Sequence, residues 1–192
     1  DGYFVIPITI GNYLSKEIHT KPISTDHEAF VAAEKAAHDR IQQLMNIQGT
    51  RSVESYHREL GLIMWNKCGM ARSEKGLKEA IAEIQALRAD FYKNVRIPGS
   101  INEFNPELDK AGRVADFLEL GELMCVDALD RNESCGGHFR EEYQTEEGEA
   151  LRDDENFAYA AAWEWTGDPG KANLHKEELT FNDIELKQRS YK

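Results

Sequence analysis

The chain has 192 residues, which is the size of one domain or of one domain with a small addition. Its 35 acidic and 23 basic residues give a net charge of −12, and a field of that sign repels the phosphates of nucleic acid and of anionic lipid. We therefore expect no nucleic-acid partner. No apolar run reaches the roughly 18 residues that a membrane-spanning helix needs, so we also expect no direct membrane insertion.

The first segment, residues 1–24, is rich in apolar side chains. It has neither a basic leader nor a small-residue cleavage site, so it does not read as a signal peptide. We expect a helix over residues 3–20, with Pro7 in its first turns, where proline is tolerated. Because Asp1 and Gly2 are followed at once by apolar residues, we interpret the chain as a piece of a longer protein.

From residue 25 to residue 131 the apolar residues recur at steps of three and four, which is the period of an α-helix. The run from Thr25 to Glu28 fits a capping box, and Gly49 fits the end of the helix that follows. We expect its buried face to consist of Phe30, Ala33, Ala37, Ile41 and Leu44.

Two further helices are expected from about Ser52 to Gly69 and from Glu74 to Val95. Their expected core residues are Val53, Tyr56, Leu60, Ile63 and Met64 in the first and Leu77, Ile81, Ile84, Leu87 and Phe91 in the second. Asn105 and Pro106 form a good helix start, because asparagine caps and proline suits the first helical position. That helix should run to about Arg131 and bury Val114, Phe117, Leu118, Gly121, Met124, Cys125 and Ala128.

After Arg131 the periodic pattern stops. Residues 133–155 hold nine acidic and only two basic residues, which predicts an irregular, solvated loop. Extended segments at 157–165 and 174–186 flank a Gly- and Pro-containing turn, which predicts a β hairpin. In the first of these the aromatics at 157, 159, 163 and 165 alternate by two and should share one strand face.

The predicted fold is mainly α. It is an antiparallel, spectrin-like bundle of three to four helices, with an irregular acidic loop and a small C-terminal β hairpin. The expected parts are a first segment at 1–24, a helical bundle at 25–131, and a loop with a β tail at 132–192.

Metal-binding patterns are incomplete. Glu54 and His57 lie one helical turn apart, but a di-iron bundle needs a second such step and two more glutamates, so a solvated helix face is the better interpretation. Cys135 and His138 would supply only two zinc ligands, and no further pair stands at a suitable spacing. We expect no metal site.

The three cysteines, Cys68, Cys125 and Cys135, are odd in number and widely spaced, which argues against a disulfide framework. Cys68 and Cys125 fall on apolar helical positions and are expected to be buried, inert thiols. Cys135 lies in a glycine-flanked but acidic loop, which disfavours a thiolate. No glycine-rich phosphate-binding turn is present, so we expect this chain to bind no flavin by itself.

One passage is more specific than these patterns. The run Arg131-Asn-Glu-Ser-Cys-Gly-Gly-His-Phe-Arg140 is similar to a signature near the C-terminus of succinate dehydrogenase and fumarate reductase flavoprotein subunits, usually Arg-x-Glu-Ser-Arg-Gly-Ala-His-x-Arg. An Arg-Asp-Asp run follows in that family and stands here at residues 152–154. The helix ending in Gly69-Met-Ala-Arg72 and the helix at 117–131 also resemble the family.

The resemblance spans roughly residues 50–165. L-aspartate oxidases carry a related Glu-Ser-Arg-Gly run, but the insertion at 141–152 and the Trp-rich tail favour the dehydrogenase and reductase branch. Cys135 replaces the usual arginine and Gly137 the usual alanine, which suggests a divergent bacterial subgroup.

The resemblance implies a function for the longer protein. In the family the flavoprotein binds FAD and interconverts succinate and fumarate, and its catalytic and flavin-binding residues lie upstream of the matched region. We therefore expect no catalytic residue in this chain, no cofactor bound by it, and FAD in the full-length subunit. The implied partners are the FAD domain of the same subunit and an iron–sulfur subunit, on the cytoplasmic side of the bacterial inner membrane.

The signature turn itself is the candidate functional site. We expect Arg131, Glu133, Ser134, His138 and Arg140 to form a hydrogen-bonded turn that docks on the FAD domain, because backbone groups at a sharp, glycine-rich bend need side-chain partners. A purely internal capping network is the alternative for these residues. For the chain as a whole, the alternative is a free-standing acidic helical interaction module.

Overall fold

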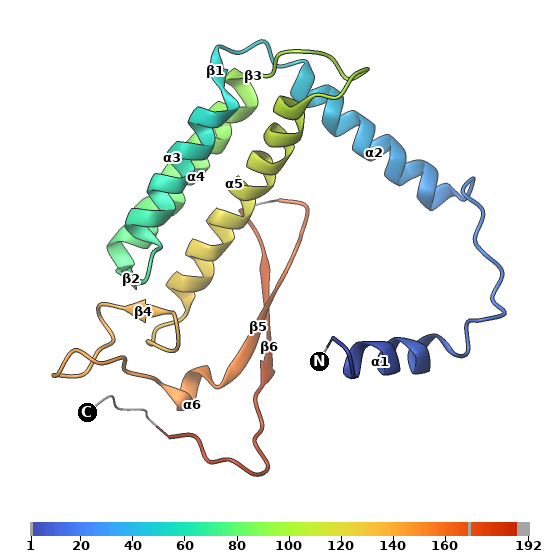
Figure 1. Cartoon of the computed structure of the whole chain (residues 1–192). Helices are drawn as coiled ribbons and strands as arrows, with labels where there is room; N and C mark the ends of the chain where they lie inside the picture. The colour runs from blue at the N-terminus through green and yellow to red at the C-terminus, as the bar shows by residue number, and fades with distance from the viewer. Residues whose placement is uncertain (1, 169, 188–192) are drawn as a thin grey trace. The chain divides into compact units, whose positions relative to one another are not determined.

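The computed structural model describes residues 2–168 and 170–187. The chain divides into two compact units, Asp1–Arg40 and Ile41–Lys192. The predicted mainly α fold is confirmed, with helices as the dominant element and short strands at their ends and in the tail (Figure 1).

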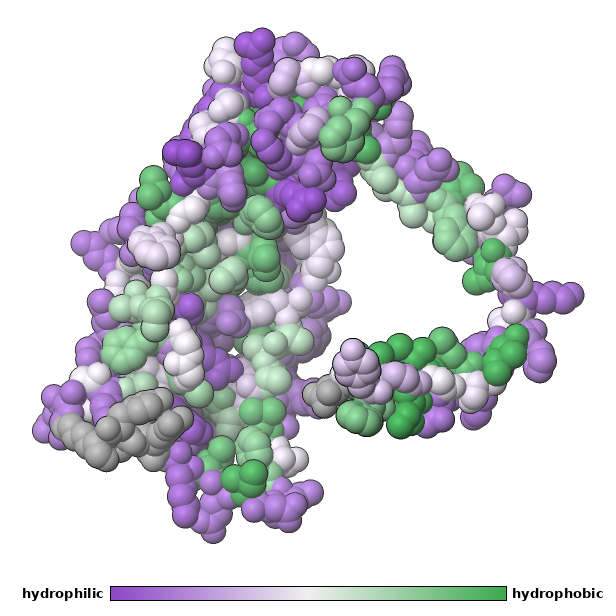
Figure 2. Space-filling view, in the orientation of Figure 1, coloured by the Kyte–Doolittle hydropathy of each residue, from purple (hydrophilic) through white to green (hydrophobic). Residues whose placement is uncertain are grey.

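The first unit contains α1 (Val5–Leu14) and most of α2 (Glu28–Met45). The expected helix over residues 3–20 is shorter than predicted, although Pro7 does lie in its first turn. The large apolar side chains of this unit are all exposed: Tyr3, Phe4, Val5, Ile6, Ile8, Ile10, Tyr13, Leu14, Ile18, Ile23, Phe30 and Val31. Figure 2 shows hydrophobic residues gathered on the surface of α1.

Three predictions about α2 are wrong. Its first turn is capped by His27, whose ring Nδ1 accepts from the backbone N–H of Ala29 at 3.2 Å, and not by Thr25. The helix ends at Met45 and not at Gly49, because the chain there turns to meet the end of another helix. A Cβ added to Gly49 would lie 1.9 Å from the backbone oxygen of Asn94, so this glycine allows a close approach. Of the expected buried face only Leu44 is buried.

The second unit is built on three helices, α3 (Val53–Lys67), α4 (Glu74–Asn94) and α5 (Pro106–Asp130), which run in alternating directions side by side (Figure 1). Side chains of Ser52, Ser73 and Asn105 accept backbone N–H groups of the first turns and so cap the three helices. The expected cores of α3 and α4 are confirmed, with Met64 and Ile81 partly buried.

On α5, the expectation that Phe117 and Met124 face inward is wrong, since they are 42% and 45% exposed. They lie one residue before Leu118 and Cys125, which occupy the buried stripe. A helix advances about 100° per residue, so a position adjacent to the stripe already turns toward solvent.

Short parallel strands join the ends of the bundle. At one end β1 (Arg51–Ser52) pairs with β3 (Val95–Arg96). At the other end β2 (Ala71–Arg72), in the α3–α4 connection, pairs with β4 (Phe139–Arg140), which follows α5. This second pair holds the signature turn against the α3–α4 connection.

The tail forms α6 (Asp154–Phe157) and an antiparallel hairpin of β5 (Tyr159–Glu164) and β6 (Asn173–Glu178). The hairpin is therefore confirmed, but its second strand is shorter than the predicted 174–186. The prediction that the four aromatics share one strand face is wrong, because Phe157 ends a helix and Trp165 lies beyond β5. The Trp163 indole N–H donates to Asp127 Oδ1 at 2.7 Å and ties the hairpin to α5. The last five residues of the expected tail, 188–192, lie outside the described residues.

Candidate functional site

The signature turn begins where α5 ends. The backbone N–H of Arg131 donates to the Asp127 carbonyl at 3.1 Å, and the chain then leaves the helix. Cys135 and His138 exchange backbone hydrogen bonds of 2.8 and 3.0 Å across a tight bend. Gly136 in this bend has φ of +60°, a conformation that favours glycine. Gly136 therefore serves the geometry of the turn.

Glu133 is a buried carboxylate, 2% exposed, that connects three segments. Its Oε1 accepts from Arg131 Nη1 at 2.7 Å, and its Oε2 accepts from the backbone N–H of Asp153 at 2.9 Å. The Arg131 guanidinium also donates to the carbonyls of Phe157 and Tyr159, both at 3.2 Å. One ion pair thus fixes the end of α5, α6 and the start of β5 together.

Ser134 and Arg140 close the turn from inside. Ser134 Oγ accepts from the Arg140 N–H at 2.8 Å and donates to the Arg140 carbonyl at 3.2 Å. The Arg140 side chain is 1% exposed, and its Nη1 donates to the carbonyls of Ala128 and Leu129 at 3.0 and 3.3 Å. A cation at the last carbonyls of a helix satisfies groups without helical partners and complements the helix dipole. Arg140 therefore caps α5.

Glu142 extends this network to the start of α4. Its Oε2 accepts from Arg140 Nε at 3.1 Å, and its Oε1 accepts from the backbone N–H of Glu74 at 2.7 Å. Partial burial alone would raise the pKa of Glu142, but the hydrogen bonds from the Glu74 backbone and from Arg140 hold that pKa below its ordinary value. The carboxylate is therefore ionised at neutral pH and bridges two helix ends.

His138 is held by both ring nitrogens. Nδ1 lies 2.9 Å from Arg72 Nη1, and Nε2 lies 3.0 Å from the Arg131 carbonyl. An arginine only donates and a carbonyl only accepts, so Nδ1 must accept and Nε2 must carry the proton. Burial, together with the charges of Arg72 and Arg140, lowers the pKa of His138, which agrees with this neutral tautomer.

The structure thus brings all five predicted residues together in the turn: one set of hydrogen bonds joins Arg131, Glu133 and His138, and an adjacent set joins Ser134 to Arg140. The polar atoms of Glu133, Ser134 and Arg140 point inward, whereas Cys135 and the glycines at 136 and 137 form the exposed outer edge. Internal capping, the alternative interpretation, is therefore directly observed for these side chains.

Sequence reasoning missed several members of the network. Glu142 was counted only as part of an acidic loop, although it binds the start of α4. Asp153 was identified in the Arg-Asp-Asp run, but its backbone bond to Glu133 was not predicted. Glu122 was also missed: it is 1% exposed, ion-paired with Arg88 and bonded to Gln85 Nε2 at 2.6 Å. Its position four residues after Leu118 was a usable signal, because that spacing places it on the buried stripe of α5.

The other sequence candidates have ordinary surroundings. Glu54 accepts from Arg58 at 3.1 Å, and the His57 ring lies 6.0 Å from that of Phe117. Within residues 2–168 and 170–187, no three His, Cys, Asp or Glu side chains gather as metal ligands would. No helix in this described part of the chain is long and apolar enough to cross a membrane.

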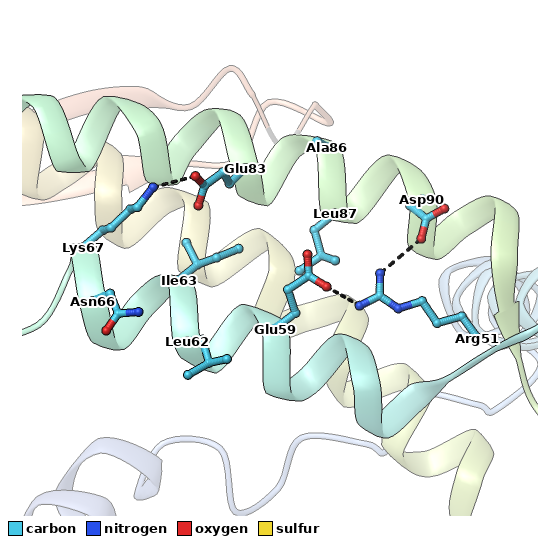
Figure 3. Close-up of a pocket in the computed structure, with 10 residues that line it drawn as sticks. All are labelled: Arg51, Glu59, Leu62, Ile63, Asn66, Lys67, Glu83, Ala86, Leu87 and Asp90. Carbon is cyan, nitrogen blue, oxygen red and sulfur yellow. Dashed lines mark hydrogen bonds and ion pairs between the residues drawn. The ribbon is translucent and has the colours of Figure 1, made fainter.

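A groove of about 480 Å³ separates α3 from α4 (Figure 3). Its floor is apolar, with Ile63 and Leu87, and its two basic side chains, Arg51 and Lys67, lie at opposite ends. Arg51 pairs there with Glu59 and with Asp90, and Lys67 pairs with Glu83. Because carboxylates already neutralise the side chains of Arg51 and Lys67, we interpret the groove as a surface feature of the bundle and not as a ligand site.

Comparisons with known proteins agree with this geometry. The family model for the fumarate reductase flavoprotein C-terminal region matches residues 57–191. The flavoprotein subunit of fumarate reductase from Helicobacter pylori is 28% identical over 183 residues, which is 95% of this chain and 25% of that protein. The subunit from Escherichia coli is 32% identical over 132 residues, 68% of this chain and 21% of that protein.

Solved structures show the same fold. An E. coli quinol fumarate reductase flavoprotein variant matches 93% of this chain and 29% of its own with a TM-score of 0.74 at 24% identity. A quinol–fumarate reductase with menaquinol molecules matches 91% of this chain and 29% of its own with a TM-score of 0.73 at 27% identity. The chain belongs to the family of fumarate reductase flavoprotein C-terminal regions, and it spans about a quarter of the length of those curated relatives.

Proposed function

We propose that this chain is part of a longer flavoprotein that carries FAD and interconverts succinate and fumarate. The observation that carries the proposal is the match of residues 57–191 to the family, together with the intact hydrogen-bonded network of its signature turn. The relatives named above are fumarate reductase flavoprotein subunits. We assign the chemistry and the FAD to the rest of the longer protein.

The role of this chain is structural. Residues 1–24 form the seam with the FAD domain, because α1 and its flanks expose Tyr3, Phe4, Ile8 and Ile18 at more than half of their surface. A contiguous exposed apolar surface of this kind is typical of an interface. A flavin-bearing neighbour of the same subunit is the partner that the family relationship suggests.

The signature turn docks on the same FAD domain through its outer edge. Glu133 and Arg140 fix the turn from inside, and Cys135 with its glycines presents the backbone outward. A small, side-chain-poor edge lets another backbone approach closely. In this arrangement five side chains position the edge: Arg131, Glu133, Ser134, His138 and Arg140.

The full-length protein would assemble with an iron–sulfur subunit, at the cytoplasmic side of the bacterial inner membrane and peripheral to it. The support is the kind of relative found, since the solved neighbours include a quinol–fumarate reductase with menaquinol molecules. A donor as apolar as a quinol is supplied from a membrane, and electrons from it reach a flavin through intermediate carriers.

The test compares the isolated chain with the full-length subunit. With FAD, a reduced dye and fumarate, the full-length subunit should oxidise the dye and the isolated chain should not. Turnover by the isolated chain would contradict the division of roles, and a full-length subunit without FAD would contradict the proposed activity.

A second experiment tests the turn by comparing Glu133→Ala with Glu147→Ala, in the exposed loop, in the full-length subunit. Only Glu133→Ala should lower flavin retention. Unchanged retention and assembly would leave the turn with its internal role alone.

A further inference from the structure

A cleft of about 240 Å³ lies between α5 and the hairpin of β5 and β6, which pack side by side (Figure 1). Its helix side consists of Asp116, Glu119, Leu120 and Leu123. These positions recur at the spacing of helical turns and therefore share one face of α5. Sites for small molecules usually exceed about 300 Å³, so the cleft has the size of a single side chain rather than of a whole ligand.

Two tryptophans form the hairpin side of the cleft, Trp163 within β5 and Trp165 just beyond its end. The hydrogen bond from the Trp163 indole to Asp127 fixes the orientation of the Trp163 ring. Trp165 exposes more than half of its surface. Tryptophan is enriched at protein interfaces, because it offers a large apolar face together with a polar edge.

The charge of the cleft is of one sign. Asp116 and Glu119 stand on its helix side, and none of the described residues that line it is basic. The groove between α3 and α4 is different, because carboxylates there already pair with Arg51 and Lys67. The whole chain carries a net charge of −12, which also favours a basic partner.

We propose that this cleft binds an arginine side chain from a basic loop of a partner protein. A guanidinium is planar and stacks on the face of an indole, and its N–H groups match the geometry of carboxylates. Asp116 and Glu119 accept from the guanidinium, while Trp163 and Trp165 contact its plane and its apolar stem. A lysine brings the same charge without a plane that stacks, so the cleft favours arginine. The proposal does not rest on the proposed activity.

The experiment titrates the full-length subunit, labelled with fluorotryptophan, with three blocked tripeptides that have glycine on both sides of arginine, lysine or citrulline. Citrulline has nearly the shape of arginine but no charge. Fluorine NMR follows Trp163 and Trp165, whose signals are assigned with Trp163→Phe and Trp165→Phe, and exposed Trp65 on α3 is the reference. We expect the arginine peptide to shift the signals of Trp163 and Trp165 to saturation, the lysine peptide to bind more weakly, and the citrulline peptide to cause no shift.

Matched variants test the two carboxylates. Asp116→Asn and Glu119→Gln should each weaken binding of the arginine peptide about two- to fivefold, as expected for the loss of one exposed ion pair. Asp130→Asn is the control, because Asp130 is exposed at the end of α5 and does not line the cleft. Equal weakening by all three variants would show that the peptide responds only to the net charge of the protein and would overturn the proposal.

The peptides themselves can also contradict the proposal. Equal shifts with the citrulline peptide would mean that the cleft is an apolar groove that does not recognise charge. Equal affinity for the lysine peptide would overturn the assignment to arginine. Shifts no larger at Trp163 and Trp165 than at Trp65 would show that the cleft is not the binding site.

Discussion

Single buried charges hold the signature turn, and Glu133 is the first of them to test. Its two oxygens accept from Arg131 and from the Asp153 backbone, in a site closed to water. Removing one partner of a buried pair leaves the other charge without compensation, which costs about 3–5 kcal/mol. We expect Glu133→Ala to lower the free energy of unfolding by that amount in urea titrations. The exposed Glu147→Ala is the control and should change it by less than about 0.5 kcal/mol.

A second residue-scale prediction concerns pH and His138. Burial lowers the pKa of His138 in the folded protein, so between about pH 6.5 and that lower pKa only the unfolded chain binds the proton. The free energy of unfolding should therefore fall as the pH falls below about 6.5, by up to about 1.4 kcal/mol per pH unit.

Urea titrations at pH 7.5 and 5.5 measure this effect. The variant His138→Asn should lose part of the acid sensitivity, whereas His38→Asn, at an exposed position, should keep it. Equal acid sensitivity in all three proteins would show that His138 does not titrate differently in the folded state.

Individual residues show why prediction from sequence stops where it does. The caps at Ser52 and Asn105 were predictable because each depends on a backbone N–H three residues away. Glu133 and His138 were identified through their motif, but their partners Asp153 and Arg72 come from other segments and followed only from the fold. The spacing of Glu122 from Leu118 indicated a buried position, but its partner Arg88 on α4 followed only from the fold.

At the scale of elements, the end of α5 depends on Arg140. Its guanidinium donates to the Ala128 and Leu129 carbonyls, which have no partners within the helix. We expect Arg140→Gln to cost roughly 2–3 kcal/mol, since carbonyls and Glu142 lose a charged donor. Hydrogen–deuterium exchange should show faster exchange in the last turn of α5 and at the start of α4. Unchanged exchange there would contradict the capping role.

The Trp163 indole ties the hairpin of β5 and β6 to α5. Trp163→Phe removes the hydrogen bond to the partly buried carboxylate of Asp127 and leaves that acceptor less satisfied, at a cost of about 1–2 kcal/mol. Amides of β5 should then exchange faster while those of α4 do not. Trp165→Phe is the matched control, because Trp165 lies beyond the strand and is 59% exposed.

The elements themselves were largely readable from local patterns. The three bundle helices follow from apolar spacing and caps, and their expected cores on α3 and α4 are buried. The start of α2 and the role of Gly49 could not be predicted from local patterns. His27 supplies the cap, and Gly49 is needed because the backbone of Asn94, far along the chain, approaches it closely. Strands of two residues, such as β2 and β4, exist only through pairing and leave no sequence pattern of their own.

At the scale of the whole molecule, the two units differ in what they bury. The second unit has a continuous core from Leu44 to Ala128, whereas the first exposes the apolar side chains of α1. A surface of that kind is stabilising only when another surface covers it. We therefore expect the FAD domain to cover α1 in the full-length subunit.

Hydrogen–deuterium exchange of α1 tests this claim most directly. The amides of Val5–Leu14 are followed in the isolated chain and in the full-length, FAD-loaded subunit, with the bundle helix α4 as the internal reference. We predict slow exchange of α1 in the full-length subunit and rapid exchange in the isolated chain, while α4 is protected in both. Equally rapid exchange of α1 in the two proteins would contradict the account.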